Sequence, residues 1–568
     1  MPRRTFLPSA LLAAALALSP LPASAQEGTA GALLAARVAG AANDFVAVVP
    51  YLERLMESEM AAPELRESLT GSYLALGRHD EAAEEARLLM DEMPLSSTGA
   101  LVLMTEAFAA RDYAAVLELI EGGAQTHPAA DGLAAAWAHL GQGSMAEVFE
   151  AFDTVAAQEG MRAFTQYCRA LALALVGDVE GAIAIIEDPE TGVADSLNRR
   201  GVIAHAQILG QLERFDDALD LLEAAFPGAH DPRIEEMRAA YAEEQALPFD
   251  LIGDPAEGMA EVMAVMTAAL RGGPGSFDAL LYARAAEWIN PKLFDAQIML
   301  GQIFVELDQP ELAEATFEAI PGDSGFAIPA AIGRAQVLDT LGKLDEAIVV
   351  LEELAADYAD AFGVHQSLGD LLRRAERFEE AAEAYGRAIE LQEAQGISGD
   401  WPLWFARAVA HERAGQWPEA EADFRRALVY APDQPLVLNY LGYSLVERRE
   451  NLDEALEMIE RAVEGDPDSG YIVDSLAWAL FRLGRFDEAL PHMERAVELM
   501  PSDPILNDHL GDVYWALGRY REARFQWRRA LSFGPHDDLD MDRVRRKIDV
   551  GLYEVLDDEG EPLPHQGE

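Results

Sequence analysis

A period close to 34 residues runs through this sequence from about Gly31 to Pro535. It is clearest at alanines that precede a short apolar stretch and that follow one another at intervals of 34: Ala279, Ala313, Ala347 and Ala381. A period of this length is typical of a unit made of two helices, which cannot bury its apolar face alone and must stack against its neighbours. The sequence therefore predicts an all-α solenoid of about 13–14 helix-turn-helix repeats.

The residue types within one repeat explain why its helices pack in pairs. In the best-formed unit, Gly511, Ala523 and Ala530 are small enough to let two antiparallel helices approach, and Tyr514 and Trp527 can fill the gaps between pairs. Glycines recur where the first helix of a unit must end, because glycine tolerates the left-handed conformation of a helix C-cap: Gly77, Gly177, Gly342, Gly415, Gly484 and Gly518. Spacing and residue types together resemble the tetratricopeptide repeat. The resemblance implies a right-handed superhelix whose hollow side is lined by the first helix of every unit.

The period is interrupted between Ala218 and Ala279, where the interval is 61 residues. We therefore predict an N-terminal array over residues 26–245, an interrupting loop over 246–258 and a C-terminal array over 259–535. A final amphipathic helix is expected within 536–556, because Val544, Ile548 and Leu552 recur at helical spacing, and it would cap the last repeat. Residues 557–568 read as a flexible acidic tail.

The first 25 residues have the three parts of a secretory signal peptide. Arg3 and Arg4 precede a short apolar stretch, and a small-residue site ends at Ala25. The apolar stretch is too short to cross a bilayer, and no cysteine stands at the cleavage site to carry a lipid. We expect a protein that is exported to the periplasm through a cleavable signal and is not lipid-anchored.

Charge and motifs argue against several function classes. The sequence has 43 Lys and Arg against 100 Asp and Glu, a net charge of −57, which disfavours contact with nucleic acid phosphates. The single cysteine, Cys168, excludes an intramolecular disulfide and a thiolate metal cluster. A Gly-Asp-Ser-Gly tetrapeptide around Ser324 is typical of a serine protease fold that is all-β, so here we interpret it as a turn. We expect no enzyme activity, no cofactor and no metal site.

Function must then lie in the surface that the repeats create. Aligned repeats near the C-terminus place polar and aromatic residues at matching positions of their first helices: Asn439, Tyr443, Asp474, Trp478, Phe481, Arg482, Asp508, Asp512 and Trp515. Aromatic residues with a polar rim are typical of binding hot spots, so these nine form our candidate protein-binding groove. The alternative, that Trp478 and Trp515 simply pack between helices, remains open. A basic stretch over residues 519–547 can pair with an acidic partner or with the protein's own acidic residues.

Segments 439–444, 474–478 and 507–515 resemble a bacterial envelope family of tetratricopeptide repeat proteins. Its members are secreted or lipid-anchored, and one is an adaptor that holds a C-terminal processing protease together with the cell-wall hydrolases it degrades. The resemblance implies a non-catalytic scaffold or adaptor that binds other envelope proteins through a peptide, a helix or a folded surface. The alternative is a structural component of outer-membrane or polysaccharide export assembly.

Overall fold

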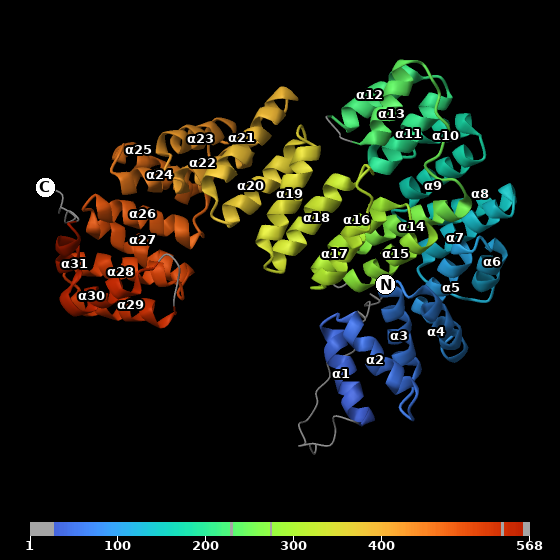
Figure 1. The fold of residues 1–568 in the computed structure, drawn as a ribbon, viewed down its shortest axis with the longest axis horizontal. Helices are drawn as coiled ribbons and strands as arrows, with labels where there is room; N and C mark the ends of the chain where they lie inside the picture. The colour runs from blue at the N-terminus through green and yellow to red at the C-terminus, as the bar shows by residue number, and fades with distance from the viewer. Residues whose placement is uncertain (1–27, 228–230, 273–274, 535–538, 561–568) are drawn as a thin grey trace, which may run out of the picture. The chain divides into compact units, whose positions relative to one another are not determined.

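The computed structural model describes residues 28–560 except 228–230, 273–274 and 535–538. Across these residues the regular structure is helical, with no β-strand (Figure 1). The predicted signal peptide, residues 1–25, lies outside the described part, as do residues 561–568 of the predicted tail. Residues 557–559 of that predicted tail are helical. The all-α prediction is confirmed.

The chain divides into two compact units, Met1–Leu354 and Ala355–Glu568, here called unit 1 and unit 2. The helices of the first part are α1 (Thr29–Ala41), α2 (Phe45–Met56), α3 (Pro63–Ala75), α4 (His79–Glu92), α5 (Ser97–Ala109), α6 (Tyr113–Glu121), α7 (Pro128–Gly141), α8 (Met145–Ala156), α9 (Arg162–Leu175), α10 (Val179–Ile186), α11 (Arg199–Gln211), α12 (Phe215–Ala225), α13 (Pro232–Ala242), α14 (Pro255–Leu270), α15 (Ser276–Ile289), α16 (Phe294–Glu306), α17 (Pro310–Glu318), α18 (Ala327–Thr340) and α19 (Leu344–Asp357). Those that follow are α20 (Phe362–Arg374), α21 (Phe378–Ala394), α22 (Trp401–Arg413), α23 (Trp417–Tyr430), α24 (Pro435–Arg448), α25 (Leu452–Gly465), α26 (Gly470–Arg482), α27 (Phe486–Leu499), α28 (Pro504–Ala516), α29 (Tyr520–Ser532), α30 (Met541–Val550) and α31 (Leu552–Glu559).

Consecutive helices form the predicted pairs. The first six pairs run from α1/α2 to α11/α12, and α13 stands without a partner helix of its own. Pairing resumes with α14/α15 and α16/α17 in unit 1, and in unit 2 it runs from α20/α21 to α28/α29. The turn inside many pairs contains a glycine with positive φ, as predicted, for example Gly77 (φ 70°), Gly415 (φ 76°) and Gly518 (φ 75°). Where the turn has no such glycine, another residue takes the left-handed conformation instead, as do Arg111, Asp308 and Glu376.

The segment between α13 and α14 is an ordered connection within unit 1. Residues 255–258 of the predicted loop belong to α14, which begins at Pro255 under the N-cap of Asp254. The side chains of Leu251 and Ile252 are buried, and the Leu251 carbonyl accepts a hydrogen bond from Arg200. This connection does not coincide with the boundary between the two units, which lies at 354/355.

The predicted single capping helix is two helices. Gly551, at φ 96°, ends α30 and begins α31, because an α-helix cannot continue through a residue with this φ. Val544, Leu552 and Val555 are buried, so both helices turn an apolar face inward. α30 packs against α29, and α31 packs against α30.

Candidate protein-binding groove

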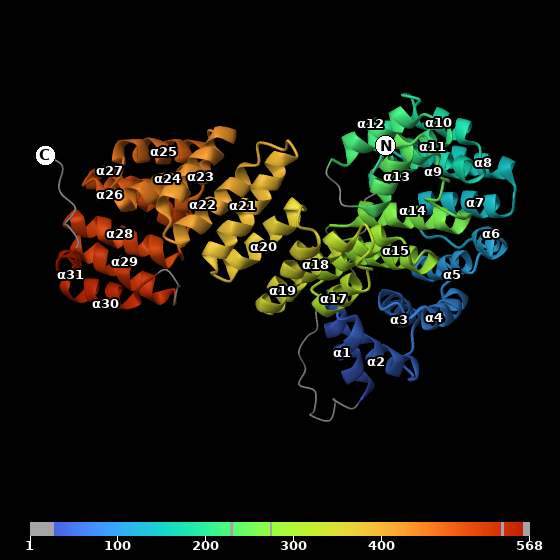
Figure 2. The same cartoon turned by 45° about the horizontal axis from the view of Figure 1, so that its top comes forward.

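In unit 1 the inner side of the repeats is covered by the chain's own helices. The first helices of its early repeats are α3, α5, α7, α9 and α11, and α14 contacts α5, α7 and α9 while α15 contacts α3 and α5 (Figure 2). The surface that would be a groove in an open solenoid is therefore occupied from within the unit.

Close packing holds α14 in this position. Gly258 lies against the Trp137 indole, and a Cβ at Gly258 would stand 2.5 Å from that ring. Trp137 is fully buried, on α7. On the same helix as Gly258, Glu261 is buried and accepts a hydrogen bond of 2.7 Å from Arg200 Nε of α11. Removing either member of a buried ion pair leaves the other charge uncompensated, so Arg200 and Glu261 are needed together.

Specific contacts to the first repeats also hold α15 in position. The Arg284 side chain donates to the Ala75 carbonyl at 2.9 Å, which satisfies a carbonyl at the C-terminal end of α3. The rings of His79 and Trp288 stack at 4.3 Å. These contacts join residues about 200 positions apart, as Ala75 and Arg284 illustrate with a separation of 209.

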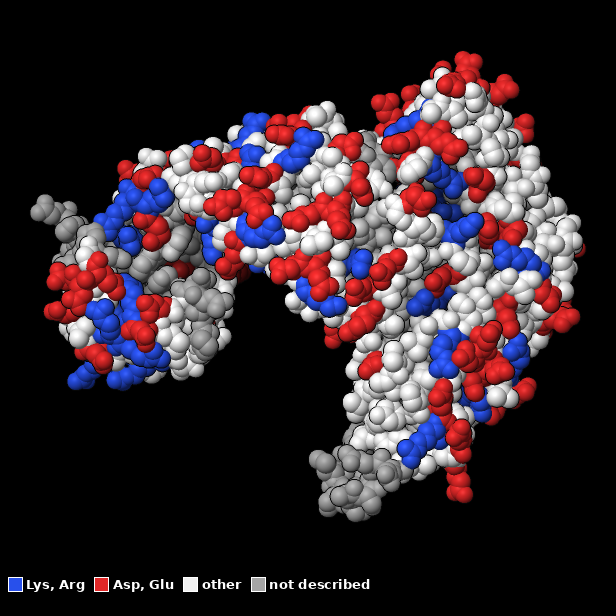
Figure 3. Space-filling view, viewed as in Figure 1, with Lys and Arg blue, Asp and Glu red and all other residues white. Residues whose placement is uncertain are grey.

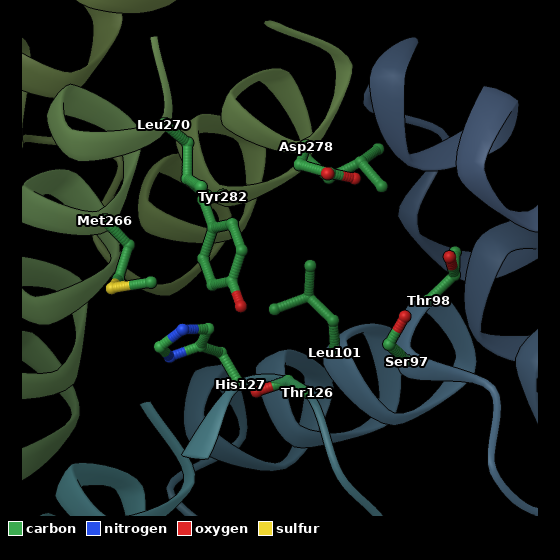
Figure 4. Close-up of a pocket in the computed structure, with 10 residues that line it drawn as sticks. Ser97, Thr98, Leu101, Thr126, His127, Met266, Leu270, Asp278 and Tyr282 are labelled. Atoms are coloured by element: carbon green, nitrogen blue, oxygen red, sulfur yellow. The ribbon is translucent and has the colours of Figure 1, made fainter. Parts of the chain in front are cut away.

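A small polar pocket remains where α14 and α15 meet α5 (Figure 4). Its volume is about 140 Å³. It is lined by Ser97, Thr98, Leu101, Thr126, His127, Met266, Leu270, Asp278, Leu281 and Tyr282. Burial raises the pKa of the Asp278 carboxyl above its ordinary value. The pocket is too small for a peptide backbone.

In unit 2 the candidate residues fall on α24, α26 and α28, as the alignment of repeats predicted, but they do not form one open surface. Phe481 is buried and packs on Phe486 at 5.4 Å, so it belongs to the core. Asp474 is also buried, and both of its carboxylate oxygens lie 3.0 Å from Nδ1 of His509.

The cap covers the three candidates on α28. Lys547 of α30 is fully buried, and its Nζ donates to Asp508 at 2.7 Å and to Asp512 at 2.8 Å. Burial alone would lower the pKa of Lys547, but these two carboxylates raise it above its ordinary value. Trp515 lies against Gly551, where a Cβ would stand 2.1 Å from the indole. Asp508 and Asp512 are buried, so the structure does not place them on an open groove, and Trp515 is half-buried against the cap.

Five of the nine candidates are half-buried rather than buried, and one of them is Trp515. The other four, together with Glu447, form what we call the α24–α26 surface: Asn439, Tyr443, Glu447, Trp478 and Arg482. Trp478 Nε1 donates to Glu447 at 2.8 Å, and its ring stacks between Phe481 at 4.9 Å and His509 at 4.1 Å. Arg482 lies 3.8 Å from Glu447. Burial, followed by the neighbouring acidic groups, raises the pKa of Tyr443. The Trp478 ring is thus held rigidly with one edge toward solvent.

Two residues of this site were missed in the sequence. Glu447 occupies the position of Arg482 one repeat earlier, 35 residues before it, so extending the same alignment would have found it. His509 had no signal, because a single histidine among eleven carries no spacing information. Only the fold shows that it lies beneath Trp478 and beside Asp474.

Basic side chains gather over α29 and α30 (Figure 3). They pair within the protein: Arg543 lies 3.1 Å from Glu559, Arg546 lies 2.6 Å from Asp558, and Lys547 pairs as described. Of the two partners considered for the basic stretch, these contacts favour the protein's own acidic residues.

The described residues contain no group of three or more His, Cys, Asp or Glu side chains placed to hold a metal ion. Ser324 lies in the turn between α17 and α18 and donates its hydroxyl to the Pro321 carbonyl at 2.6 Å, as expected of a turn serine. In the same part of the chain, every helix is too short or too polar to cross a bilayer.

Part of this chain matches known family models. Residues 367–534 match a family model described as tetratricopeptide repeat, and residues 332–396 match a second model with the same description. Together the two matches cover residues 332–534. Arrays of such repeats are scaffolds for protein–protein interaction, with extended surfaces for partners or peptides.

This chain is also similar to a relative and to several solved structures. A TPR repeat-containing protein of Pseudomonas aeruginosa is 28% identical over 192 residues, which cover 34% of this chain and 31% of that protein. The match thus spans about a third of the relative's length. Similar solved structures include MamA (24% identical, 30% of this chain and 96% of that chain, TM-score 0.26). They also include YrrB, described as a TPR protein with an unusual peptide-binding site, which is 19% identical over 33% of this chain and 93% of that chain, with a TM-score of 0.27. A third is the APC/C hetero-tetramer Cut9–Hcn1, which is 12% identical over 93% of this chain and 97% of that chain, with a TM-score of 0.35.

Proposed function

We propose that this protein is a non-catalytic scaffold that binds a partner protein on the α24–α26 surface. One observation carries the proposal: the inner side of the unit 1 repeats is filled by α14 and α15, whereas Trp478 and Tyr443 stay partly accessible on the first helices of unit 2. An aromatic ring fixed by stacking loses little entropy on binding, and Arg482 and Glu447 supply the polar rim.

Site-directed photo-cross-linking in intact cells tests the surface. A photoreactive phenylalanine analogue in place of Tyr443 should give one discrete adduct, and adding Trp478→Ala with Arg482→Glu should abolish it. The same analogue at Phe525 of α29, 59% exposed in the same unit, is the matched control and should give no such adduct. Equal adducts at both positions, or none at Tyr443, would reject the α24–α26 surface.

We propose further that the scaffold works in the periplasm and presents envelope proteins to a protease. The supports are the signal-like residues 1–25 and the resemblance of segments 439–444, 474–478 and 507–515 to a protease adaptor. Holding two proteins on one scaffold raises their effective concentration to about the millimolar range. Release by osmotic shock and a mature N-terminus at Gln26 would support the location. The adduct at Tyr443 should contain a protease or its substrate, and a cytoplasmic partner would reject this role while leaving the scaffold intact.

A further inference from the structure

The first helix of unit 1 has an apolar face that nothing in the described residues covers. Leu34 and Val38, one turn apart on α1, are 53% and 64% exposed, and Val46 at the start of α2 is 60% exposed. The opposite side of α1 is already used, because Ala32, Ala36 and Ala39 are buried. A helix that is apolar on all sides is normally buried on all sides.

The charge around this face is exceptional for the chain. Between Gly28 and Leu52 there is one acidic residue, Asp44, and one basic residue, Arg37. The whole chain has 100 acidic residues in 568, so about four would be expected in these 25 positions. Asp44 moreover caps α2 by accepting a hydrogen bond from the Ala47 backbone. Two copies with a net charge of −57 repel each other over most of their surface, and this face is free of that repulsion.

The other terminal repeat is closed differently. There α30 and α31 cover α28 and α29, and their outer residues are charged, as in the pairs of Arg543 with Glu559 and Arg546 with Asp558. A polar outer surface is what a terminal repeat needs to remain soluble. α1 offers no such surface, so its face requires a partner.

We propose that the exposed apolar side chains Leu34 and Val38 of α1, together with Val46 at the start of α2, are the interface through which two copies of this protein associate. A face that is apolar and nearly uncharged complements itself, which a two-fold axis requires. Alanines and glycines along α1 permit two helices to lie close together. A membrane surface is a poorer occupant, because interfacial helices combine an apolar face with a strongly basic one, and the side of α1 opposite Leu34 packs against α2.

Association would give the scaffold two α24–α26 surfaces in one particle. The contact area is small, so we expect a dissociation constant in the micromolar range, of about 1–10 µM. This inference does not depend on the proposed function, because the face belongs to unit 1 and the α24–α26 surface to unit 2.

Sedimentation velocity of the full chain from about 1 to 100 µM should show a monomer–dimer equilibrium at about 0.15 M salt. Leu34→Glu with Val38→Glu should leave a monomer with unchanged helicity, since both side chains are exposed. The control Leu95→Glu with Val429→Glu changes two side chains that are 78% and 65% exposed elsewhere, and it should still dimerise.

Cross-linking gives a second readout. The natural Cys168 is buried, so Val38→Cys introduces a single reactive thiol, which should form a disulfide-linked dimer on mild oxidation, whereas Val429→Cys should not. A monomer at every concentration, or association that survives Leu34→Glu with Val38→Glu, overturns the proposal. So does a monomeric chain that sediments with phosphatidylglycerol vesicles unless these two residues are changed, because the face would then be a membrane contact.

Discussion

Single residues decide which of the predicted site positions are accessible. Lys547 is one of three lysines in the chain, and it is buried between Asp508 and Asp512. The two carboxylates that pair with the Lys547 ammonium group both belong to α28. A buried cation of this kind contributes specificity of docking more than net stability.

Removing that cation should be costly. Lys547→Met removes the ammonium group that pairs with two buried carboxylates, so unit 2 should lose about 3–5 kcal/mol of unfolding free energy near neutral pH. Urea unfolding followed by circular dichroism measures this loss. The control is Lys343→Met, because the Lys343 side chain is 44% exposed and its amino group lies 3.8 Å from Glu314. Its cost should stay below about 1 kcal/mol. Equal losses in the two variants would contradict the buried pairing.

His509 makes the stability of unit 2 depend on pH. Burial tends to lower its pKa, but Asp474, assisted by Asp508 and Asp512, raises the pKa above the ordinary value of 6.5. A raised pKa in the folded state means that the protonated ring stabilises the fold. This contribution is complete below pH 6.5 and is lost as the pH rises through the folded-state pKa.

The corresponding experiment compares urea midpoints between pH 6 and pH 8.5. The wild-type midpoint should fall with rising pH, and Asp474→Asn should flatten the curve because it removes the charge that raises the pKa of His509. Trp478, stacked on the ring, should report the same transition by fluorescence. A slope unchanged in Asp474→Asn would show that other groups cause it.

At the scale of elements, the decisive feature is α14. It begins after the interruption in the period and crosses the first helices of unit 1 instead of continuing their stack. The absence of a side chain at Gly258 permits this crossing, because Trp137 fills the space.

A side chain at Gly258 should disturb the crossing. Gly258→Ala forces a Cβ to within 2.5 Å of the buried Trp137 ring, so we expect a loss of about 1–3 kcal/mol from overpacking. Thermal unfolding and hydrogen exchange in α7 and α14 measure it. Gly322→Ala, where an added Cβ meets nothing within 4 Å, is the control in the same unit and should change little. Fast exchange in α14 of the wild type would indicate that the helix is not docked.

At the scale of the molecule, net charge opposes folding. With −57 charges, compactness brings carboxylates together, although arginines offset many of them locally in pairs such as Arg407 with Asp423 at 2.6 Å. The repulsion between carboxylates acts over long distances, whereas the ion pairs act over a few ångströms. Salt should therefore weaken the repulsion more than the ion pairs.

Raising NaCl from about 0.01 to 0.15 M shortens the Debye length from about 30 to 8 Å and should raise the thermal midpoint by a few degrees. Differential scanning calorimetry at constant pH measures the shift. Choline chloride at the same ionic strength should act alike, which separates screening from specific ion binding. A midpoint that falls with salt would mean that ion pairs outweigh the repulsion.

The repeating helix pairs and their turn residues could be predicted from the sequence, because a 34-residue period, a glycine such as Gly518 and small residues such as Ala523 act within one pair of helices and its neighbours. The same alignment of repeats placed Trp478 and Tyr443 on the correct helices. Which surfaces stay open is visible only in the folded protein. α14 and α15 cover the inner side of unit 1 and α30 covers Asp508 and Asp512, through contacts between residues far apart in sequence that follow no period. Such docking depends on the shape and charge of two surfaces that exist only once the helices have folded. A repeat pattern does not specify which surfaces will fit together.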